Sequence, residues 1–584
     1  MPAVRRSQVG ARSQQVAIED LIAVAAGDRD ADLVLKNGMV VNVFSGEIYR
    51  SDVGIQGNRI AGVGSYSGKN VIDVEGKYVC PGLIDGHVHI ESSMVSIPEF
   101  ARVVVPQGTT TVVVDPHEIA NVMGAEGILF TLKASKYNPL NVFVMLPSCV
   151  PSTDLETAGA ELKAVDLFPF LSDKWVLGLG EMMNYHGVIA RNDDVMDMIK
   201  IASGKRIDGH APGVTGRRLN AYAAGGIQSD HESVSIEEAR EKLRVGFHIM
   251  LREGSASKNL LDLLPLVTER NADRFIFVTD DKHPGDLLSE GHVNHLLKLA
   301  IAHGIEPALA VKMSSLNAAE YYRLEKIGAV APGYYADIAV LENFEECRST
   351  LVLKNGEVVA RDGKPVYELS SRYRHPLRSS VNIKAVNVDD FVIPARKGKA
   401  NIIGLVPGQI TTEWLCERPT TKNGGVVADV SSDILKLAVI ERHHASGNIG
   451  LGLVKGFGLK RGAFASSVAH DSHNIIVVGV DEGDMLCAVQ RIVEMQGGLC
   501  VCSGGSCIES LPLPIAGLMS EESMERVRDK LDALNAAVRV LGIGISDPFM
   551  AASFLALPVI PKLKLTDKGL VDVEGFKLID LFLE

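Results

Sequence analysis

Residues Pro81–Met94 read PGLIDGHVHIESSM, an apolar run that ends in the pair His87 and His89. Side chains alternate between the two faces of a strand, so residues i and i+2 point the same way and both imidazoles can reach one ion. A single His-x-His pair is weak evidence, because such pairs are common by chance. The stretch indicates a strand with a candidate metal site at its end. Whether that site is supported depends on ligand-type residues elsewhere in the chain.

Seven more apolar runs follow this one, and they also end in polar or acidic residues. Segments whose apolar residues have helical spacing lie between most of these runs, for example Ile236–Leu243 and Leu260–Glu269. Eight strand–helix units over roughly 230 residues are what a (β/α)8 barrel predicts, while a doubly wound open sheet is the competing α/β arrangement. The eight runs are Tyr78–His89, Thr109–Asp115, Asn141–Ser148, Trp175–Glu181, Arg206–His210, Gly226–His231, Gly246–Glu253 and Phe275–Asp280.

The residues that can bind metals or transfer protons gather at the carboxyl ends of these runs. Barrel enzymes build their sites at that end, which favours the barrel over the open sheet. Imidazoles and carboxylates together suit Zn, Fe or Mn. Two ions that share a carboxylate explain the number of ligands best, and ordinary hydrogen-bonded histidines are the structural alternative. The set is His87, His89, His117, Glu181, His210, His231 and Asp280, whereas His248, His292, His295 and His303 fall inside a strand or a helical stretch.

A short repeat flanks the barrel. Leu33–Val41 reads LVLKNGMVV and Leu351–Val359 reads LVLKNGEVV, and each contains Asn-Gly, a strong hairpin signal. Because about 310 residues separate the copies, a tandem array is excluded, and the copies are expected to be two arms of one β-structure with a large insertion between them.

The predicted fold is therefore α/β, with a metal-dependent (β/α)8 TIM-like barrel (81–319) inserted in a composite β-sandwich (31–80 and 320–370). A short surface helix over Ile18–Ala26 belongs to an N-terminal helical extension (1–30). Ser370–Ser380 is polar and predicts a linker. A C-terminal α+β domain (385–584) follows, with a strand–helix unit in Asn474–Val480 and Gly483–Met495 and a turn or close-packed loop over Gln496–Gly505.

Composition restricts the function. The 584 residues carry a formal net charge of -13, which argues against a nucleic-acid partner because that needs a concentrated basic face. No apolar run reaches the roughly 18–20 residues of a membrane helix, and the N-terminus lacks the apolar stretch of a secretory signal. Eight cysteines without a CxxC pair suit reduced thiols. We expect a cytoplasmic protein without membrane contact.

The same stretches resemble the amidohydrolase superfamily. Pro81–Met94 is similar to its first metal-binding strand, and GAVAPGYYADIAVLEN (Gly328–Asn343) is similar to its composite sandwich. More narrowly, the chain resembles the bacterial adenine deaminase family. The motifs are DPHEIANVMG (Asp115–Gly124), GLGEMMN (Gly178–Asn184), DGHAPG (Asp208–Gly213), SDHES (Ser229–Ser233), VTDDKHP (Val278–Pro284) and KGFGLKRGAFASSVAHDSHNIIVVG (Lys455–Gly479).

The resemblance implies a role for each ligand. His87, His89 and Asp280 would hold a first ion and His210 and His231 a second. Glu181 would bridge them where many superfamily members have a carbamylated lysine, since Lys174 lies at the wrong end of its strand. His117 is left open as an indirect partner, an extra ligand or a substrate contact. The family suggests two divalent ions, Mn(II) or Fe(II), the ligand types also permit Zn(II), and barrels of this kind often form homo-oligomers, with a dimer favoured.

The implied reaction is the hydrolytic deamination of adenine to hypoxanthine and ammonia, as in purine salvage. Two ions that share a water lower its pKa and make hydroxide available to attack C6. Glu232 would donate a proton to the ring nitrogen, and Asp280 would pass the proton of the water to the leaving ammonia. For Glu232 the alternative is a surface carboxylate or a salt bridge to Arg252. The alternative functions are a cyclic amidase or another nucleobase deaminase on the same barrel, and a metal-free binding module.

Several further residues have weaker signals. Asp281 would replace Asp280 if the register were shifted by one, and the rim residues Ser92, Ser93 and Arg252 either contact the purine or are only solvated. His470 and His473 are a candidate metal pair, although a structural or interdomain role is favoured. Cys500, Cys502 and Cys507 match no ordinary zinc spacing and are expected to pack.

Overall fold

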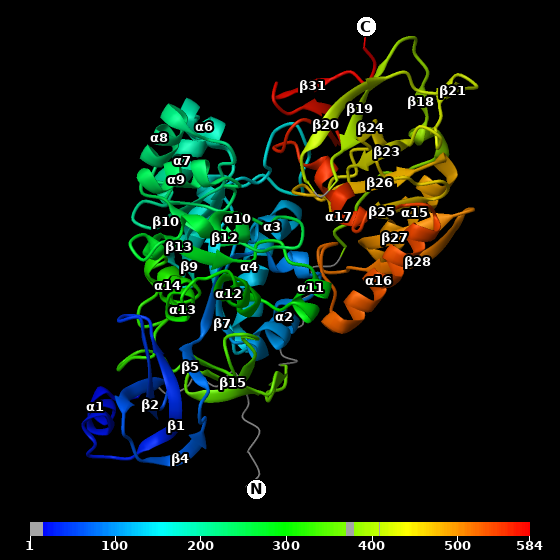
Figure 1. The fold of residues 1–584 in the computed structure, drawn as a ribbon. Helices are drawn as coiled ribbons and strands as arrows, with labels where there is room; N and C mark the ends of the chain where they lie inside the picture. The colour runs from blue at the N-terminus through cyan, green and yellow to red at the C-terminus, as the bar shows by residue number, and fades with distance from the viewer. Residues whose placement is uncertain (1–15, 370–378, 408, 584) are drawn as a thin grey trace.

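The computed structural model describes residues 16–369, 379–407 and 409–583, and parallel strands form its centre (Figure 1). They make two sheets of nearly continuous buried residues, as expected for parallel strands that are covered on both faces. The first sheet has the order β10-β9-β8-β7-β6 and the second the order β11-β12-β13. Their strands are β6 (Leu83–Val88), β7 (Thr109–Val114), β8 (Asn141–Leu146), β9 (Val176–Met182), β10 (Arg206–Gly209), β11 (Ser229–Asp230), β12 (His248–Arg252) and β13 (Phe275–Val278).

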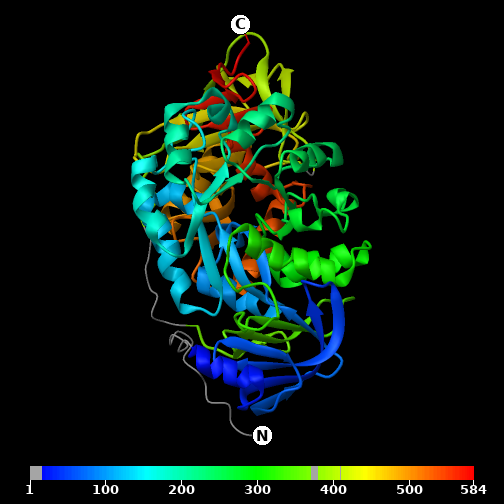
Figure 2. The ribbon, with the colours of Figure 1, turned by 90° about the vertical axis from the view of Figure 1, so that its left-hand side faces the viewer.

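Backbone hydrogen bonds join the two parallel sheets at both edges. On one side Asp280 N donates to His87 O over 2.9 Å and His89 N donates to Asp280 O over 3.3 Å; on the other, Gln228 N donates to Ile207 O over 3.2 Å. The strands therefore curl toward one another (Figure 2). The surrounding helices are α2 (Ile97–Val104), α3 (His117–Met123), α4 (Ala125–Ala134), α6 (Tyr185–Ala190), α7 (Asp193–Ile201), α8 (Gly216–Ala224), α9 (Ile236–Arg244), α10 (Leu260–Leu263), α11 (Pro284–Ser289), α12 (Val293–Ala302), α13 (Pro307–Met313) and α14 (Leu316–Tyr321).

A nine-stranded mixed sheet lies at the opposite end of the molecule from the C-terminus (Figure 1). It contains both copies of the repeat, which confirms that they are arms of one β-structure. The predicted run Tyr78–His89 is divided, since β5 belongs to this sheet and β6 to the parallel one. The strands are β1 (Ala31–Asn42), β2 (Glu47–Gln56), β3 (Arg59–Gly64), β4 (Gly68–Asp73), β5 (Tyr78–Pro81), β14 (Ile338–Leu341), β15 (Ser349–Lys354), β16 (Glu357–Arg361) and β17 (Lys364–Pro365).

The two Asn-Gly pairs of the repeat differ in structure. The second forms the predicted hairpin between β15 and β16, whereas the prediction of a hairpin in the first copy is wrong, because β1 continues through Asn37 and Gly38. The strand β2 pairs with β1 on both sides of this point, with an irregular register between Leu35 and Gly38. Asn37 has a φ of 61°, so this Asn-Gly makes a bulge in a long strand.

The C-terminal part contains an eight-stranded sheet covered by α15 (Glu482–Met495) and followed by α16 (Met524–Val540). The predicted strand–helix unit is confirmed in β26 and α15. The prediction of a loop over Gln496–Gly505 is wrong, because β27 forms a hairpin with β28 in which Cys500 and Cys502 are buried. The expectation that Cys507 packs is also wrong, because Cys507 is exposed near the turn of this hairpin. The strand order is β20 (Thr412–Glu417), β19 (Ala400–Leu405), β24 (Ile449–Lys455), β23 (Ile434–Ile440), β26 (Ile475–Gly479), β25 (Ala463–Ser466), β27 (Gly498–Ser503) and β28 (Ser506–Pro512).

The remaining expectations concern the ends and the linker. Helix α1 spans Ile18–Ala26, as predicted. Most of the expected linker Ser370–Ser380 lies outside the described residues, as does 1–15 of the N-terminal extension. In the described ranges, no helix has both the length and the hydropathy that crossing a membrane requires.

Candidate metal centre and active site

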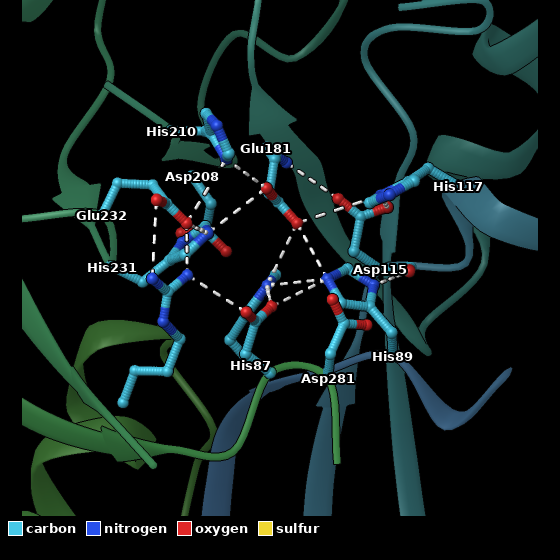
Figure 3. A network of polar contacts seen from close by, with 12 residues as sticks. His87, His89, Asp115, His117, Glu181, Asp208, His210, His231, Glu232 and Asp281 are labelled. Carbon is cyan, nitrogen blue, oxygen red and sulfur yellow. Dashed lines mark hydrogen bonds and ion pairs between the residues drawn. The ribbon is translucent and has the colours of Figure 1, made fainter. Parts of the chain in front are cut away.

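The carboxyl ends of five parallel strands bring the predicted ligands together (Figure 3). Each candidate ligand lies at or within two residues of the end of its strand, and the side chains converge on one another. His210 is partly exposed and the others are buried. The residues are His87 and His89 from β6, Glu181 from β9, His210 after β10, His231 after β11 and Asp280 after β13.

Four ligand atoms form the first group: His87 Nε2, His89 Nε2, Glu181 Oε1 and Asp280 Oδ1. Five of the distances between them are between 2.9 and 3.2 Å. The centre of a regular tetrahedron with such edges lies about 1.9 Å from each corner, close to the 2.0–2.2 Å of zinc bonds to nitrogen and oxygen. The spacing of these four atoms therefore fits one divalent ion.

The second group forms around the other oxygen of the same carboxylate. Glu181 Oε2 lies 2.8 Å from His210 Nδ1 and 3.3 Å from His231 Nε2. Glu181 Oε1 is buried and accepts no hydrogen bond, although two imidazole nitrogens face it. Acceptor atoms that converge without protons between them repel one another unless a cation lies among them. The donor set fits a pair of divalent ions with Glu181 between them.

Neighbouring groups fix the ligands in place. His89 Nδ1 donates to the backbone oxygen of Asp115 over 2.9 Å, so the lone pair of Nε2 faces the ligand group. The Asp115 carboxylate accepts the backbone N–H of Glu181 over 2.8 Å. Asp280 has a φ of 59°, a left-handed conformation that a residue other than glycine rarely adopts, and its backbone is held by hydrogen bonds to β6.

Glu232 lies beside the second group and is also paired with Arg252. Its Oε1 is 3.2 Å from His231 Nε2, and the Arg252 guanidinium contacts both this carboxylate and Asp280 Oδ2, the latter at 3.1 Å. The salt bridge to Arg252, which was the alternative considered for Glu232, therefore exists, but inside the site, and Arg252 is buried rather than solvated at the rim. Burial alone would raise the pKa of Glu232, but Arg252, with His210 and His231, holds it well below its usual value.

The weaker candidates lie around this core. His117 Nδ1 is 3.9 Å from Glu181 Oε1 and 3.5 Å from Asp115 Oδ1, so it stands beside the first group. Asp281 accepts a hydrogen bond from Ser92 over 2.5 Å, whereas Asp280 Oδ1 lies 3.2 Å from His87 Nε2. Ser93 donates to the backbone of Ile90.

A further buried cluster joins this end of the strands to the C-terminal part. His470 Nδ1 donates to Glu118 Oε1 over 2.6 Å, and His473 Nε2 contacts Glu118 Oε2. His470 and His473 thus connect the C-terminal part of the chain to Glu118, which follows the end of a parallel strand. Glu118 was not identified from the sequence, although its position directly after His117 at a strand end is the signal that could have indicated it.

Two family models match the chain. The model of the amidohydrolase family matches residues 78–359, and the model of the adenine deaminase C-terminal domain matches residues 409–577. The chain is 50% identical to adenine deaminase 2 of Carboxydothermus hydrogenoformans over 567 residues, which are 97% of this chain and 100% of the relative. It is 50% identical to an adenine deaminase of Methanothrix thermoacetophila over 570 residues, again 97% of this chain and 100% of the relative.

Among solved structures, a β-aspartyl dipeptidase of Fervidobacterium islandicum AW-1 matches with a TM-score of 0.44 and 20% identity. It covers 59% of this chain and 100% of its own.

Proposed function

The chain belongs to the adenine deaminase family of the amidohydrolases, and from this premise we propose that it hydrolyses adenine to hypoxanthine and ammonia. The observation that carries the proposal is the position of Glu181. Its two oxygens reach two separate groups of imidazole nitrogens at the carboxyl ends of the parallel strands. A carboxylate shared in this way suits two divalent ions and hydrolytic chemistry.

The ligand sets follow the two groups. His87, His89 and Asp280 would hold one ion, His210 and His231 the other, and Glu181 would bind both. Bound divalent ions would supply a water of lowered pKa as the nucleophile near neutral pH. We propose Mn(II) or Fe(II), with Zn(II) also compatible with these ligands. His117 Nδ1 lies 3.9 Å from Glu181 Oε1, near enough for His117 to be an extra ligand beside these two sets.

Two carboxylates would move the protons. The low pKa of Glu232 means that it is ionised in the resting site, so it can protonate the ring nitrogen beside C6 only after it has accepted a proton from the attacking water. This adds a step to the role expected from the sequence. Asp280, which contacts the same guanidinium, would accept the second proton of the water from the hydroxyl group formed at C6 and deliver it to the leaving ammonia.

We also propose that the two parallel sheets form one (β/α)8 barrel over 81–319. It is supported by the backbone hydrogen bonds between β6 and Asp280 and between Gln228 and β10. The barrel would be inserted in a composite sandwich (31–80 and 320–370), preceded by the extension 1–30 and followed by the domain 385–584. The sharing of one sheet by both repeat copies supports this arrangement.

The reaction is tested with metal-loaded protein and adenine in water enriched in oxygen-18. We expect hypoxanthine and ammonia in equal amounts, with one atom of the heavy isotope in each hypoxanthine, and no product from the chelated protein. A metal-loaded protein that leaves adenine unchanged would contradict the proposed substrate.

A further inference from the structure

A cavity lies between the carboxyl ends of the parallel strands and the C-terminal part of the chain. Ser92 and Glu118 line it from one side and His470, His473, Leu499 and Phe549 from the other. Ser92 donates to Asp281, the neighbour of the candidate ligand Asp280, and Glu118 follows His117 directly. The cavity therefore adjoins the candidate metal centre, and both parts of the chain form its walls.

Glu118 is the most strongly positioned polar group of this cavity. It is 2% exposed, and its two oxygens contact His470 and His473, while His117 Nε2 also lies 3.4 Å from Oε1. The backbone N–H of Ala469 donates to His473 Nδ1 over 3.1 Å, so the proton of this ring is on Nε2, toward Glu118. The ring of His470 stacks on Phe554 at 4.8 Å and 12°. Both imidazoles are thus fixed as donors to one carboxylate.

The proposed reaction steps do not use Glu118, His470 or His473. The Glu118 carboxylate is, however, an acceptor that suits one part of the substrate. Each carboxylate oxygen has two lone pairs, so Glu118 can accept another hydrogen bond at Oε2 besides its contacts with the three histidines. An adenine with C6 at the metal centre directs its five-membered ring away from the metals, and the free base has an N–H donor there, at N9. Apolar walls with a few convergent polar groups are typical of a site for a flat heterocycle.

We propose that this cavity binds the five-membered ring of the purine and that Glu118 accepts a hydrogen bond from N9–H. The proposal rests on the proposed function. His470 and His473 are positioning residues, because they hold the carboxylate rather than the base. The site then selects purines that are unsubstituted at N9. An N9 substituent removes the N–H donor, so the buried carboxylate of Glu118 loses this hydrogen bond.

The test compares adenine with 9-methyladenine in the metal-loaded wild type and in Glu118→Gln and Glu118→Ala. We expect the wild type to favour adenine in kcat/KM by about 100-fold or more, because a site built to bind an N–H rejects the analogue without it. In both variants the preference should fall below about 10-fold, mainly through a higher KM for adenine, with the bound metal unchanged. The isosteric Glu118→Gln carries the test alone if Glu118→Ala does not fold.

The matched control is Glu156→Gln. Glu156 is also 2% exposed and accepts a hydrogen bond from Ser152 over 2.5 Å, but it does not line the cavity. Burial raises its pKa to about 8, so the amide resembles its neutral form. This variant should keep the wild-type preference. An unchanged preference in folded, metal-loaded Glu118 variants would overturn the inference alone, whereas a wild type that does not deaminate adenine would overturn the proposed function as well.

The positioning role has its own readout. His470→Ala should raise the KM for adenine more than the KM for 9-methyladenine. His470→Asn should recover part of this loss, because its amide N–H can replace Nδ1–H toward Glu118. Equal effects on the two substrates would contradict a positioning role for His470.

Discussion

Glu181 is the residue on which the candidate centre depends. Its two oxygens contact different imidazole groups, and its backbone N–H is held by Asp115. One carboxylate can contact both groups because, when ionised, it has two oxygens that act only as acceptors. The sequence position of Glu181, at the end of the fourth predicted strand, therefore has a direct structural meaning.

The Glu232→Gln variant tests the proton carrier. We expect it to retain both metals and to lose turnover by at least about 100-fold, because the amide cannot accept and return a proton. Steady-state kinetics with adenine and metal analysis of the same sample measure both properties.

Glu253→Gln is the control for this variant. Glu253 is also buried near a strand end and paired with a cation, Lys258 at 2.6 Å, but it is not among the ligand groups. It should keep nearly full activity. Near-wild-type turnover in Glu232→Gln would remove Glu232 from the mechanism.

Arg252→Gln tests the electrostatic role of the guanidinium. Removing this positive charge should raise the pKa of Glu232, and the enzyme needs this residue ionised to accept a proton. The acid limb of the kcat/KM profile should therefore move to higher pH, by about one unit or more for a charge in direct contact. A pH profile whose acid limb stays in place would show that another group controls it.

The candidate ligand residues could be predicted individually, whereas their contacts with the C-terminal part of the chain could not. His87 and His89 follow from strand alternation, and Glu181, His210, His231 and Asp280 from their place at strand ends. The contact of Glu118 with His470 joins residues 352 positions apart, and no local pattern contains that information. The burial of Arg252 likewise depends on packing around the whole centre.

At the scale of elements, the contact between β6 and the end of β13 brings candidate ligands from the two sheets together. We call this contact, through Asp85 and Thr279, the joint. Asp85 is fully buried in this joint and accepts hydrogen bonds from Thr279 N over 3.1 Å, from Thr279 Oγ1 over 2.5 Å and from His87 N over 3.2 Å. It therefore connects the strand that carries His87 and His89 to the segment that leads to Asp280.

Asp85→Ala should lower the free energy of unfolding by about 3 kcal/mol, because it leaves buried donors without an acceptor. Thr279→Val, which removes only the hydroxyl bond, should cost about 1 kcal/mol. Urea unfolding of the metal-free proteins excludes any effect of metal affinity. An Asp85→Ala protein as stable as the wild type would show that the joint does not depend on this carboxylate.

Strands and helices were predictable where the spacing of apolar residues determines them. They were less predictable where a glycine was taken as the signal of a turn or loop. The eight runs correspond to β6–β13, because buried parallel strands are apolar throughout. Asn37-Gly38 was misjudged because a turn signal is local, whereas β2 pairs with β1 on both sides of it. In Gln496–Gly505, the flanking glycines concealed the strand-forming Leu499–Cys502, whose pairing with β25 and β28 decides its structure.

At the scale of the whole molecule, the C-terminal part lies against the end of the strands that carries the site (Figure 1). Ser520 N donates to Met94 O over 2.8 Å, and Ser96 N donates to Ser520 O over 3.1 Å, so this part contacts the loop that follows His89. Together with the Glu118 cluster, these contacts give the last 200 or so residues a place next to the site, which the sequence did not reveal.

The most direct test of the central claim is a titration of metal-free protein with Mn(II), with bound metal and adenine deamination measured in each sample. Because Glu181 connects two ligand groups, we predict that activity reaches its maximum at two bound ions per chain and that Glu181→Ala loses this activity at every metal concentration. Full activity at one bound ion, or an active Glu181→Ala variant, would contradict the account.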